Sequence, residues 1–250
     1  MQSLDTLFTP AQRQRLSDAI PRRYACRTYA APPSVADWAA LSYAAERYAL
    51  PGARLILMHV GESLFTGTLL SMGRVTGCTA VAAVVASSSV ENSRLHAGIL
   101  GEALCLEAVA MGLGCCWISG TYRKKQLQAT LKNDEAVLAI IALGVPRQKD
   151  AQPPRKRKPL EKLCEGDITL WPEELRQAAE AVRQAPSAMN LQPWTMKLGH
   201  YRFSFDAPDR AQLDLGIGLC HAELALRGSH TWHFRQSRRD PATWIEERST

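Results

Sequence analysis

Residues 185–194, APSAMNLQPW, carry side chains suited to holding a polar small molecule. The Asn190 amide can donate and accept hydrogen bonds at once, and the Ser187 hydroxyl lies three residues before it. Prolines near both ends make the segment too broken for a helix interior, and its polarity does not suit a core strand. The pattern predicts a binding turn.

Basic residues could supply the charge for an anionic ligand. The chain has 30 basic and 24 acidic residues, a net charge of +6, and its basic clusters are RQR at 13–15, RR at 22–23, RKK at 123–125, RKRK at 155–158 and RR at 238–239. Guanidinium groups bind phosphate oxygens bidentately and keep their charge, which favours an anionic small molecule. Nucleic acid is the alternative, but acidic residues are interspersed and no recognition motif or aromatic platform accompanies the clusters.

Metal and disulfide chemistry have little support. The seven cysteines are odd in number, most lie in apolar segments and no C-x-x-C occurs, so buried thiols are expected even at the adjacent Cys115 and Cys116. His230 and His233 have a helical ligand spacing, but HTWHF is typical of a strand. We therefore expect no bound metal.

The overall composition is that of an ordinary globular protein. Of the 250 residues, 46% are hydrophobic and 22% charged, which allows one large domain or two packed halves. No apolar run reaches the roughly 18 residues that a membrane helix needs, and the N-terminus has no signal-peptide pattern. These features predict a cytoplasmic protein with no membrane segment.

The periodicity of apolar residues predicts mixed helices and strands. Thr9 before Pro10 and Ser34 before a helical run are typical helix starts. The apolar run at 136–144 indicates a strand of the parallel or central type. Helices are expected at 9–20, 34–49, 94–113, 121–132, 171–186 and 212–228, and strands at 53–60, 79–87, 115–119, 136–144, 195–199 and 201–206.

The second part of the chain repeats the order of the first. AAERYALPGARLILMH and AEAVRQAPSAMNLQPWTMKL each predict a helix, a proline and then a strand. GEALCLEAVAMGLGCCWI and IGLCHAELALRGSHTWHF each predict a helix of small residues, a glycine and a strand that contains tryptophan. This order favours a tandem duplication. The copies are unequal, because YALPGARL has no counterpart to Ser187 and Asn190.

Four segments together resemble the FMN-dependent nitroreductase family, and in particular its branch with two fused halves: RRYACRTY (22–29), GLGCCWISG (112–120), PPRKRKPLEKL (153–163) and APSAMNLQPW. The resemblance spans about residues 20–235. It implies an α+β fold of two pseudo-symmetric halves, each with a central mixed or antiparallel sheet flanked by helices. The expected halves are 1–165 and 166–235, with a tail at 236–250.

The resemblance also implies where FMN is held, with one flavin per chain in a monomer that acts as a pseudo-dimer. It places four arginines at the phosphate: Arg23, Arg27, Arg155 and Arg157. It places Pro186, Ser187, Ala188 and Asn190 on the flavin and Ser119 and Gly120 at its N5–O4 edge. Where the family often has serine this chain has Ala25, preceded by Tyr24, so a cofactor contact at these two positions must come from the backbone or be lost. Gln192, Pro193 and Trp194 are expected to shape the turn, and no residue is assigned as a catalytic acid or base.

The activity that the resemblance implies is an FMN-dependent NAD(P)H oxidoreductase. It would pass hydride from NAD(P)H through the flavin to a small organic acceptor such as a nitroarene or quinone. Two alternatives remain open at this point. One is a flavin carrier or sensor with little turnover, and the other is a basic, nucleic-acid-associated protein that has lost flavin.

Overall fold

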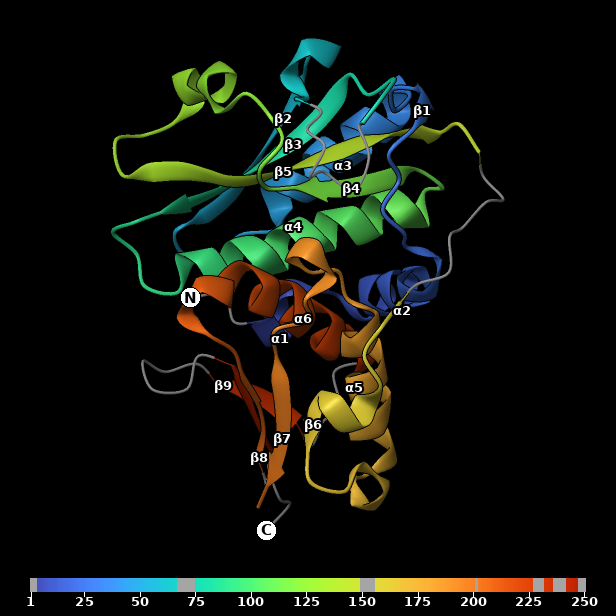
Figure 1. Cartoon of the computed structure of the whole chain (residues 1–250), viewed down its shortest axis with the longest axis vertical. Coiled ribbons are helices and arrows are strands. Elements are labelled where there is room, and N and C mark those ends of the chain that lie inside the picture. The colour runs from blue at the N-terminus through green and yellow to red at the C-terminus, as the bar shows by residue number, and fades with distance from the viewer. Residues whose placement is uncertain are drawn as a thin grey trace.

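The structure is a computed structural model that describes residues 4–66, 75–148, 156–200, 202–226, 232–235 and 242–246. It is an α+β fold with two β-sheets. In Figure 1 the sheets lie toward opposite ends of the long axis, and helices α4 (Ser93–Ala110) and α6 (Gln212–Ala225) lie between them. None of the described helices is long and apolar enough to cross a membrane.

The first sheet has four main strands in the order β4-β5-β3-β2, and each neighbouring pair is antiparallel. A short strand, β1, pairs with the end of β5. Helix α3 (Val35–Arg47) begins at Ser34 with a capping box to Asp37. The strands are β1 (Tyr29–Ala31), β2 (Ala53–His59), β3 (Ala80–Ser87), β4 (Gly114–Ile118) and β5 (Glu135–Pro146).

The second sheet has the order β9-β10-β8-β7, again antiparallel throughout, and β6 adds a short parallel pairing to β7. Helix α5 (Glu173–Gln184) lies between β6 and β7 in the chain and packs on α6. The strands are β6 (Cys164–Glu165), β7 (Thr195–Gly199), β8 (Arg202–Asp206), β9 (Trp232–Arg235) and β10 (Thr243–Glu246).

The two sheets share one connectivity. The run α3-β2-β3-α4-β4-β5 and the run α5-β7-β8-α6-β9-β10 have the same order of helices and strands, and equivalent strands occupy equivalent places in each sheet. Short 3-10 helices fill several connections: η1 (Ile20–Arg22), η2 (Glu62–Leu64), η3 (Lys124–Thr130), η4 (Leu160–Lys162), η5 (Ile168–Leu170), η6 (Ala188–Asn190) and η7 (Asp209–Ala211).

Helices α4 and α6 cross at two glycines. A Cβ placed on Gly98 would lie 2.2 Å from the Leu213 carbonyl oxygen, and one placed on Gly216 would lie 2.0 Å from the Leu95 carbonyl oxygen. Only glycine allows so close an approach of two backbones. Because α4 also packs on the strands of the first sheet, it is buried along most of its length.

The N-terminal helix α2 (Pro10–Ala19) contacts both central helices. It follows α1 (Leu4–Leu7), and Thr9 caps it through a capping box with Gln12, as the sequence predicts. Arg13 forms an ion pair with the buried Glu223 of α6, and Arg15 forms one with the buried Glu107 of α4. Within the RQR cluster Arg13 is therefore buried and Arg15 is exposed, and the two arginines tie α2 to both central helices.

The apolar strand β5 is central, as the sequence predicts, and all its pairings are antiparallel. Three other expectations need correction. The expected basic helix at 121–132 is a 3-10 helix, Lys124–Thr130. The expected tail contains a strand of the second sheet, because Thr243–Glu246 forms β10 between β8 and β9 and buries Trp244 completely. Likewise β6, placed before residue 166 in the first half, belongs to the second sheet.

Candidate functional site

The turn at residues 185–194, called here the Asn190 turn, is organised around the buried side chain of Gln192. Its Nε2 donates to the Arg183 carbonyl at 3.1 Å, and its Oε1 accepts from the Lys158 backbone N–H at 2.8 Å. The Gln192 backbone N–H donates to the Ser187 hydroxyl at 2.8 Å. With Trp194 also buried, this confirms that Gln192 and Trp194 shape the turn from beneath.

The end of the basic connection is joined directly to this turn. Arg157, which lies 33 residues before Asn190, donates from Nη1 to the Asn190 side-chain oxygen and from Nη2 to the Gln184 carbonyl at 3.0 Å. The Asn190 side-chain nitrogen donates back to the Lys156 carbonyl at 2.8 Å. Two segments that the sequence assigns to one ligand are thus a single hydrogen-bonded unit.

The backbone of the turn is unusual. Met189, Asn190 and Gln192 have φ values of 50°, 56° and 44°, in the left-handed region that side-chain-bearing residues seldom adopt. Such conformations cluster at binding sites, where surrounding contacts hold them. The exposed Met189 and Leu191 flank Asn190, and the Ala188 N–H donates to Asp214 at 2.9 Å. Burial raises the pKa of the Asp214 carboxyl.

A second group of side chains surrounds the fully buried Glu102 of α4. We call this group the Glu102 cluster: Arg23, Glu102, Trp117 and His221. Trp117 Nε1 donates to Glu102 Oε2 at 2.8 Å, and His221 Nε2 lies 2.9 Å from Glu102 Oε1. Arg23 Nε lies 3.4 Å from the same Oε1 as an ion pair. The cluster joins the RRYACRTY segment, strand β4 and helix α6.

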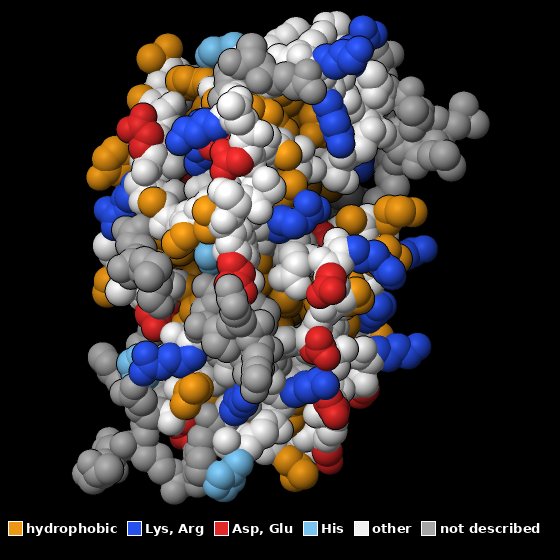
Figure 2. Space-filling view, turned by 90° about the vertical axis from the view of Figure 1, so that its left-hand side faces the viewer, with side chains coloured by type: hydrophobic (Ala, Val, Ile, Leu, Met, Phe, Trp, Pro, Cys, Tyr) orange, Lys and Arg blue, Asp and Glu red, His pale blue; other side chains and the backbone are white. Residues whose placement is uncertain are grey.

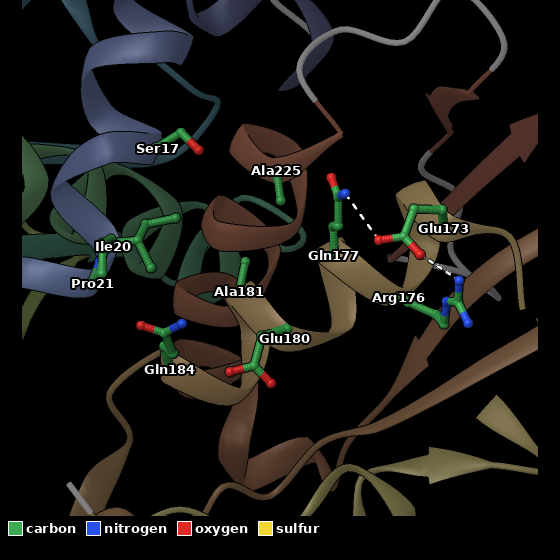
Figure 3. A pocket seen from close by; sticks show the side chains of 10 residues that line it. All are labelled: Ser17, Ile20, Pro21, Glu173, Arg176, Gln177, Glu180, Ala181, Gln184 and Ala225. Atoms are coloured by element: carbon green, nitrogen blue, oxygen red, sulfur yellow. Dashed lines mark hydrogen bonds and ion pairs between the residues drawn. The ribbon is translucent and has the colours of Figure 1, made fainter. Parts of the chain in front are cut away.

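The C-terminal turn of α5 connects the Glu102 cluster with the Asn190 turn. His221 Nδ1 lies 2.9 Å from the Ala181 carbonyl, and the Gln184 carbonyl accepts from Arg157. A hollow of about 400 Å³ lies along the length of α5, from Glu173 to Gln184. Figure 3 shows Ile20 and Pro21 facing it from the chain just before Arg23, and Ala181 and Gln184 facing it from α5. The front of the chain and the Asn190 turn therefore approach the same end of α5.

Arg27 and Ala25 lie along β4. Ala25 is exposed and makes a bridge to Cys115. Arg27 is half-buried, and its charge partly opposes the burial that raises the pKa of the Cys116 thiol to about 11. The first basic segment therefore lies beside the strand that leads to Ser119.

The remaining predicted residues are half-buried, exposed or outside the described chain. Burial raises the pKa of Tyr24 to about 12, so its phenol stays protonated at neutral pH. Ser119 and Gly120 are exposed where β4 ends, and within the described chain a Cβ on Gly120 would meet no atom within 4 Å. Pro186 is half-buried beside the exposed Ala188. Arg155 lies outside the described residues.

The residues present fit a phosphate-bearing cofactor. Arg23 is 3% exposed, yet Nε has no hydrogen-bond partner in the described chain and meets Glu102 only at ion-pair distance. A buried guanidinium normally satisfies its donors, because leaving them unpaired is unfavourable. An anionic ligand oxygen would meet this need. This observation concerns Arg23 alone, and the assignment of all four arginines to a phosphate stays a prediction.

The charge distribution bears on the alternative ligands. On the face shown in Figure 2, Lys and Arg side chains are interspersed with Asp and Glu and with hydrophobic groups. Among the described residues, no group of three or more His, Cys, Asp and Glu side chains could hold a metal ion, and His230 lies outside them. All seven cysteines are buried free thiols, as the sequence predicts.

Residues 16–226 match a protein-family model described as "Putative TM nitroreductase". The chain belongs to this nitroreductase family. It shares its fold with the crystal structure of a "putative nitroreductase" from Thermotoga maritima, at 23% identity and a TM-score of 0.65, covering 92% of this chain and 93% of that one. A comparison with curated proteins gave no match.

Smaller nitroreductases align with part of the chain. A nitroreductase with bound FMN from Bacteroides fragilis is 14% identical with a TM-score of 0.47, covering 61% of this chain and 98% of that one. An FMN-dependent nitroreductase from Clostridium difficile is 17% identical with a TM-score of 0.43, covering 52% of this chain and 87% of that one.

Sequence reasoning did not identify Glu102 as part of the site. The available signal was a carboxylate within the apolar helix GEALCLEAVAMG, where a buried charge requires partners. His221 lies in the apolar segment IGLCHAELAL, where its local sequence gives no sign of a partner. Neither local periodicity nor spacing indicates that these two residues, 119 positions apart, share a hydrogen bond.

Proposed function

We propose that the protein is an FMN-dependent oxidoreductase that passes hydride from NAD(P)H through flavin to a small organic acceptor such as a nitroarene or quinone. Membership of the nitroreductase family supports this proposal. The observation that carries it is the contact between Arg157 and Asn190, which unites two of the proposed flavin-binding segments. The Arg23 Nε, which makes no hydrogen bond within the described chain, supports an anion near Arg23.

Each proposed residue has a distinct task. Arg23, Arg27, Arg155 and Arg157 would bind the phosphate, since guanidinium matches its charge and geometry. The amide of Asn190 would address polar atoms of the flavin, and the exposed backbone at Ser119 and Gly120 would offer hydrogen-bond donors to its edge. When bound, FMN supplies the hydride chemistry. No side chain is assigned to move a proton.

We also propose that one chain corresponds to a nitroreductase dimer, with two duplicated halves and one flavin. Their common strand order and the close crossing of α4 and α6 support this view. A monomer would then be sufficient for activity. The segment YALPGARL, which forms the loop between α3 and β2 and the start of β2, lacks counterparts to Ser187 and Asn190, so the second pocket would hold no flavin.

Flavin content and turnover test the proposed activity directly. We expect the purified protein to be yellow, to contain one FMN per chain and to oxidise NAD(P)H when a quinone or nitroarene is added. A yellow protein that turns over neither acceptor would favour the carrier or sensor alternative. A colourless protein that binds polynucleotide, with affinity that falls steeply with salt, would favour the nucleic-acid alternative.

Replacing Arg157 with alanine should weaken FMN binding by about 10- to 100-fold, since one charge-assisted contact contributes roughly 1.5–3 kcal/mol. Fluorescence titration with FMN measures this change. Arg157→Lys keeps the charge but cannot contact both Asn190 and the Gln184 carbonyl, so we expect an intermediate loss. Arg176→Ala is the control, because Arg176 forms an exposed pair with Glu173. Unchanged affinity in Arg157→Ala would remove this residue from the phosphate site.

A further inference from the structure

The hydrogen bonds around His221 require one proton more than a neutral imidazole carries. His221 is fully buried, with Nδ1 2.9 Å from the Ala181 carbonyl and Nε2 2.9 Å from Glu102 Oε1. A carbonyl oxygen can only accept, so Nδ1 must donate. Nε2 then also carries a proton and donates to Glu102, or Glu102 is protonated and donates to Nε2. In both cases the pair holds one proton between Nε2 of His221 and Oε1 of Glu102, in addition to the proton on Nδ1.

This proton determines the charge that faces Arg23. With the proton in place, His221 and Glu102 together carry no net charge, and the Arg23 guanidinium gives the cluster a charge of +1. Without it, the Glu102 carboxylate neutralises Arg23. The distances agree with the first state, because Glu102 makes its short contacts to Trp117 and His221 while Arg23 Nε stays 3.4 Å away.

We propose that Glu102 and His221 form a buried proton-holding pair that sets how strongly Arg23 attracts an anion. Glu102 is a positioning residue in this scheme, since it acts through Arg23. The inference rests on the proposed function where the anion is FMN, whose phosphate Arg23 would meet. Anion binding and proton retention then reinforce each other, so each must strengthen the other by the same factor.

Other ionisable groups near the pair do not supply this proton. Cys105 on α4 and Cys220 on α6 are thiols whose pKa values are raised well above the usual range by burial, so they stay neutral. Glu107 on α4 is already paired with Arg15 and Tyr48, and Glu223 on α6 with Arg13 and Trp244. Cys115 on β4 faces Cys105 as a further buried thiol. Arg23 is the cation that contacts the pair.

The pH dependence of FMN affinity tests the proposal. Because a phosphate monoester titrates near pH 6, measurements between about pH 7 and 9 keep the ligand dianionic. We expect the wild-type dissociation constant to rise at the pH where NMR shows that the pair loses its proton, with a limiting slope of about tenfold per pH unit for one linked proton. Affinity that does not change across that loss of the proton overturns the proposal.

Two substitutions on α4 separate this effect from general damage. In Glu102→Gln the carboxylate is absent, so FMN affinity should vary by about twofold or less between about pH 7 and 9. Glu107→Gln is the matched control, because it removes another buried carboxylate of the same helix that pairs with Arg15 instead of Arg23. It should keep the wild-type pH dependence. A wild-type slope in Glu102→Gln contradicts the proposal.

The shared proton can also be detected without flavin or any substitution that could unfold the chain. Nitrogen-15 NMR of the wild type should show a proton on both ring nitrogens of His221, or a protonated Glu102 carboxyl in carbon-13 spectra. A neutral His221 beside an ionised Glu102 at neutral pH would refute the pair. If the wild type binds no FMN, the proposed function fails, and the same titration with sulfate, which keeps its charge at these pH values, still tests the pair against Arg23.

Discussion

Gly216→Ala should destabilise the protein by about 3 kcal/mol or more, at the upper end of the cost of overpacking. The new methyl group would lie 2.0 Å from the Leu95 carbonyl oxygen and 3.0 Å from the Gly98 Cα. These are backbone atoms, which cannot rotate away as a side chain would. Helices α4 and α6 would therefore have to separate, and the contacts that join the two sheets through them would loosen.

Urea unfolding measures this loss, and Gly218→Ala is its matched control on the same helix. A Cβ at Gly218 would lie 3.5 Å from Trp194 and 3.6 Å from Val182, which is ordinary contact with side chains. Alanine also favours a helix over glycine by about 0.5–1 kcal/mol, so this variant should be neutral or slightly more stable. Equal midpoints for the two variants would show that α4 and α6 do not cross as closely as described.

The same crossing supports the candidate site. Glu102 lies one turn beyond Gly98 on α4, and His221 lies slightly more than one turn beyond Gly216 on α6. The hydrogen bond between these two side chains therefore depends on the close approach of their helices. A Gly216→Ala protein that remains folded should also lose the pH dependence expected of FMN affinity, because its proton-holding pair would be pulled apart.

Much of the fold could be predicted from local signals. Thr9 and Ser34 cap helices where expected, and Gly112, with a φ of 82°, follows the end of α4. Strand β10 could not be predicted in this way, because its four residues carry a weak alternation and lie between charged residues. Strand β10 forms because it pairs with β8, about 40 residues earlier in the chain. The local pattern of apolar and polar residues does not indicate such long-range contacts.

The candidate site, like the fold, could be predicted from the sequence only in part. The amide of Asn190 and the basic cluster at 155–158 could each be identified as binding elements from residue type. Their contact through Arg157 could be expected only from the family resemblance. The Glu102 cluster was missed because its members come from the N-terminal segment, α4, β4 and α6, and each looks ordinary in its local sequence. Folding brings these four residues into contact, and they form one charged cluster.

Trp244→Ala should destabilise the protein by about 3–5 kcal/mol, the usual loss for a buried aromatic side chain. Trp244 is fully buried, and its ring centroid lies 5.1 Å from that of Phe234 and 5.5 Å from that of Phe205. Its Nε1 also donates to Glu223 at 3.0 Å. Urea unfolding should give this result, whereas a loss below about 1 kcal/mol would mean that residues 242–246 do not complete the second sheet.

Trp244→Phe separates ring packing from the hydrogen bond, with an expected loss of about 1–3 kcal/mol from leaving Glu223 less well paired. Glu223 also binds Arg13 of α2, so Trp244→Phe and Arg13→Met should be coupled by about 0.5–3 kcal/mol in a double-mutant cycle. The matched cycle with Arg15→Met should be additive, because Arg15 binds Glu107 on α4 instead. Equal coupling energies in the two cycles would contradict the arrangement in which Arg13 holds α2 to α6 and Arg15 holds α2 to α4. The contrast would show that the C-terminal strand supports the N-terminal helix through one buried carboxylate.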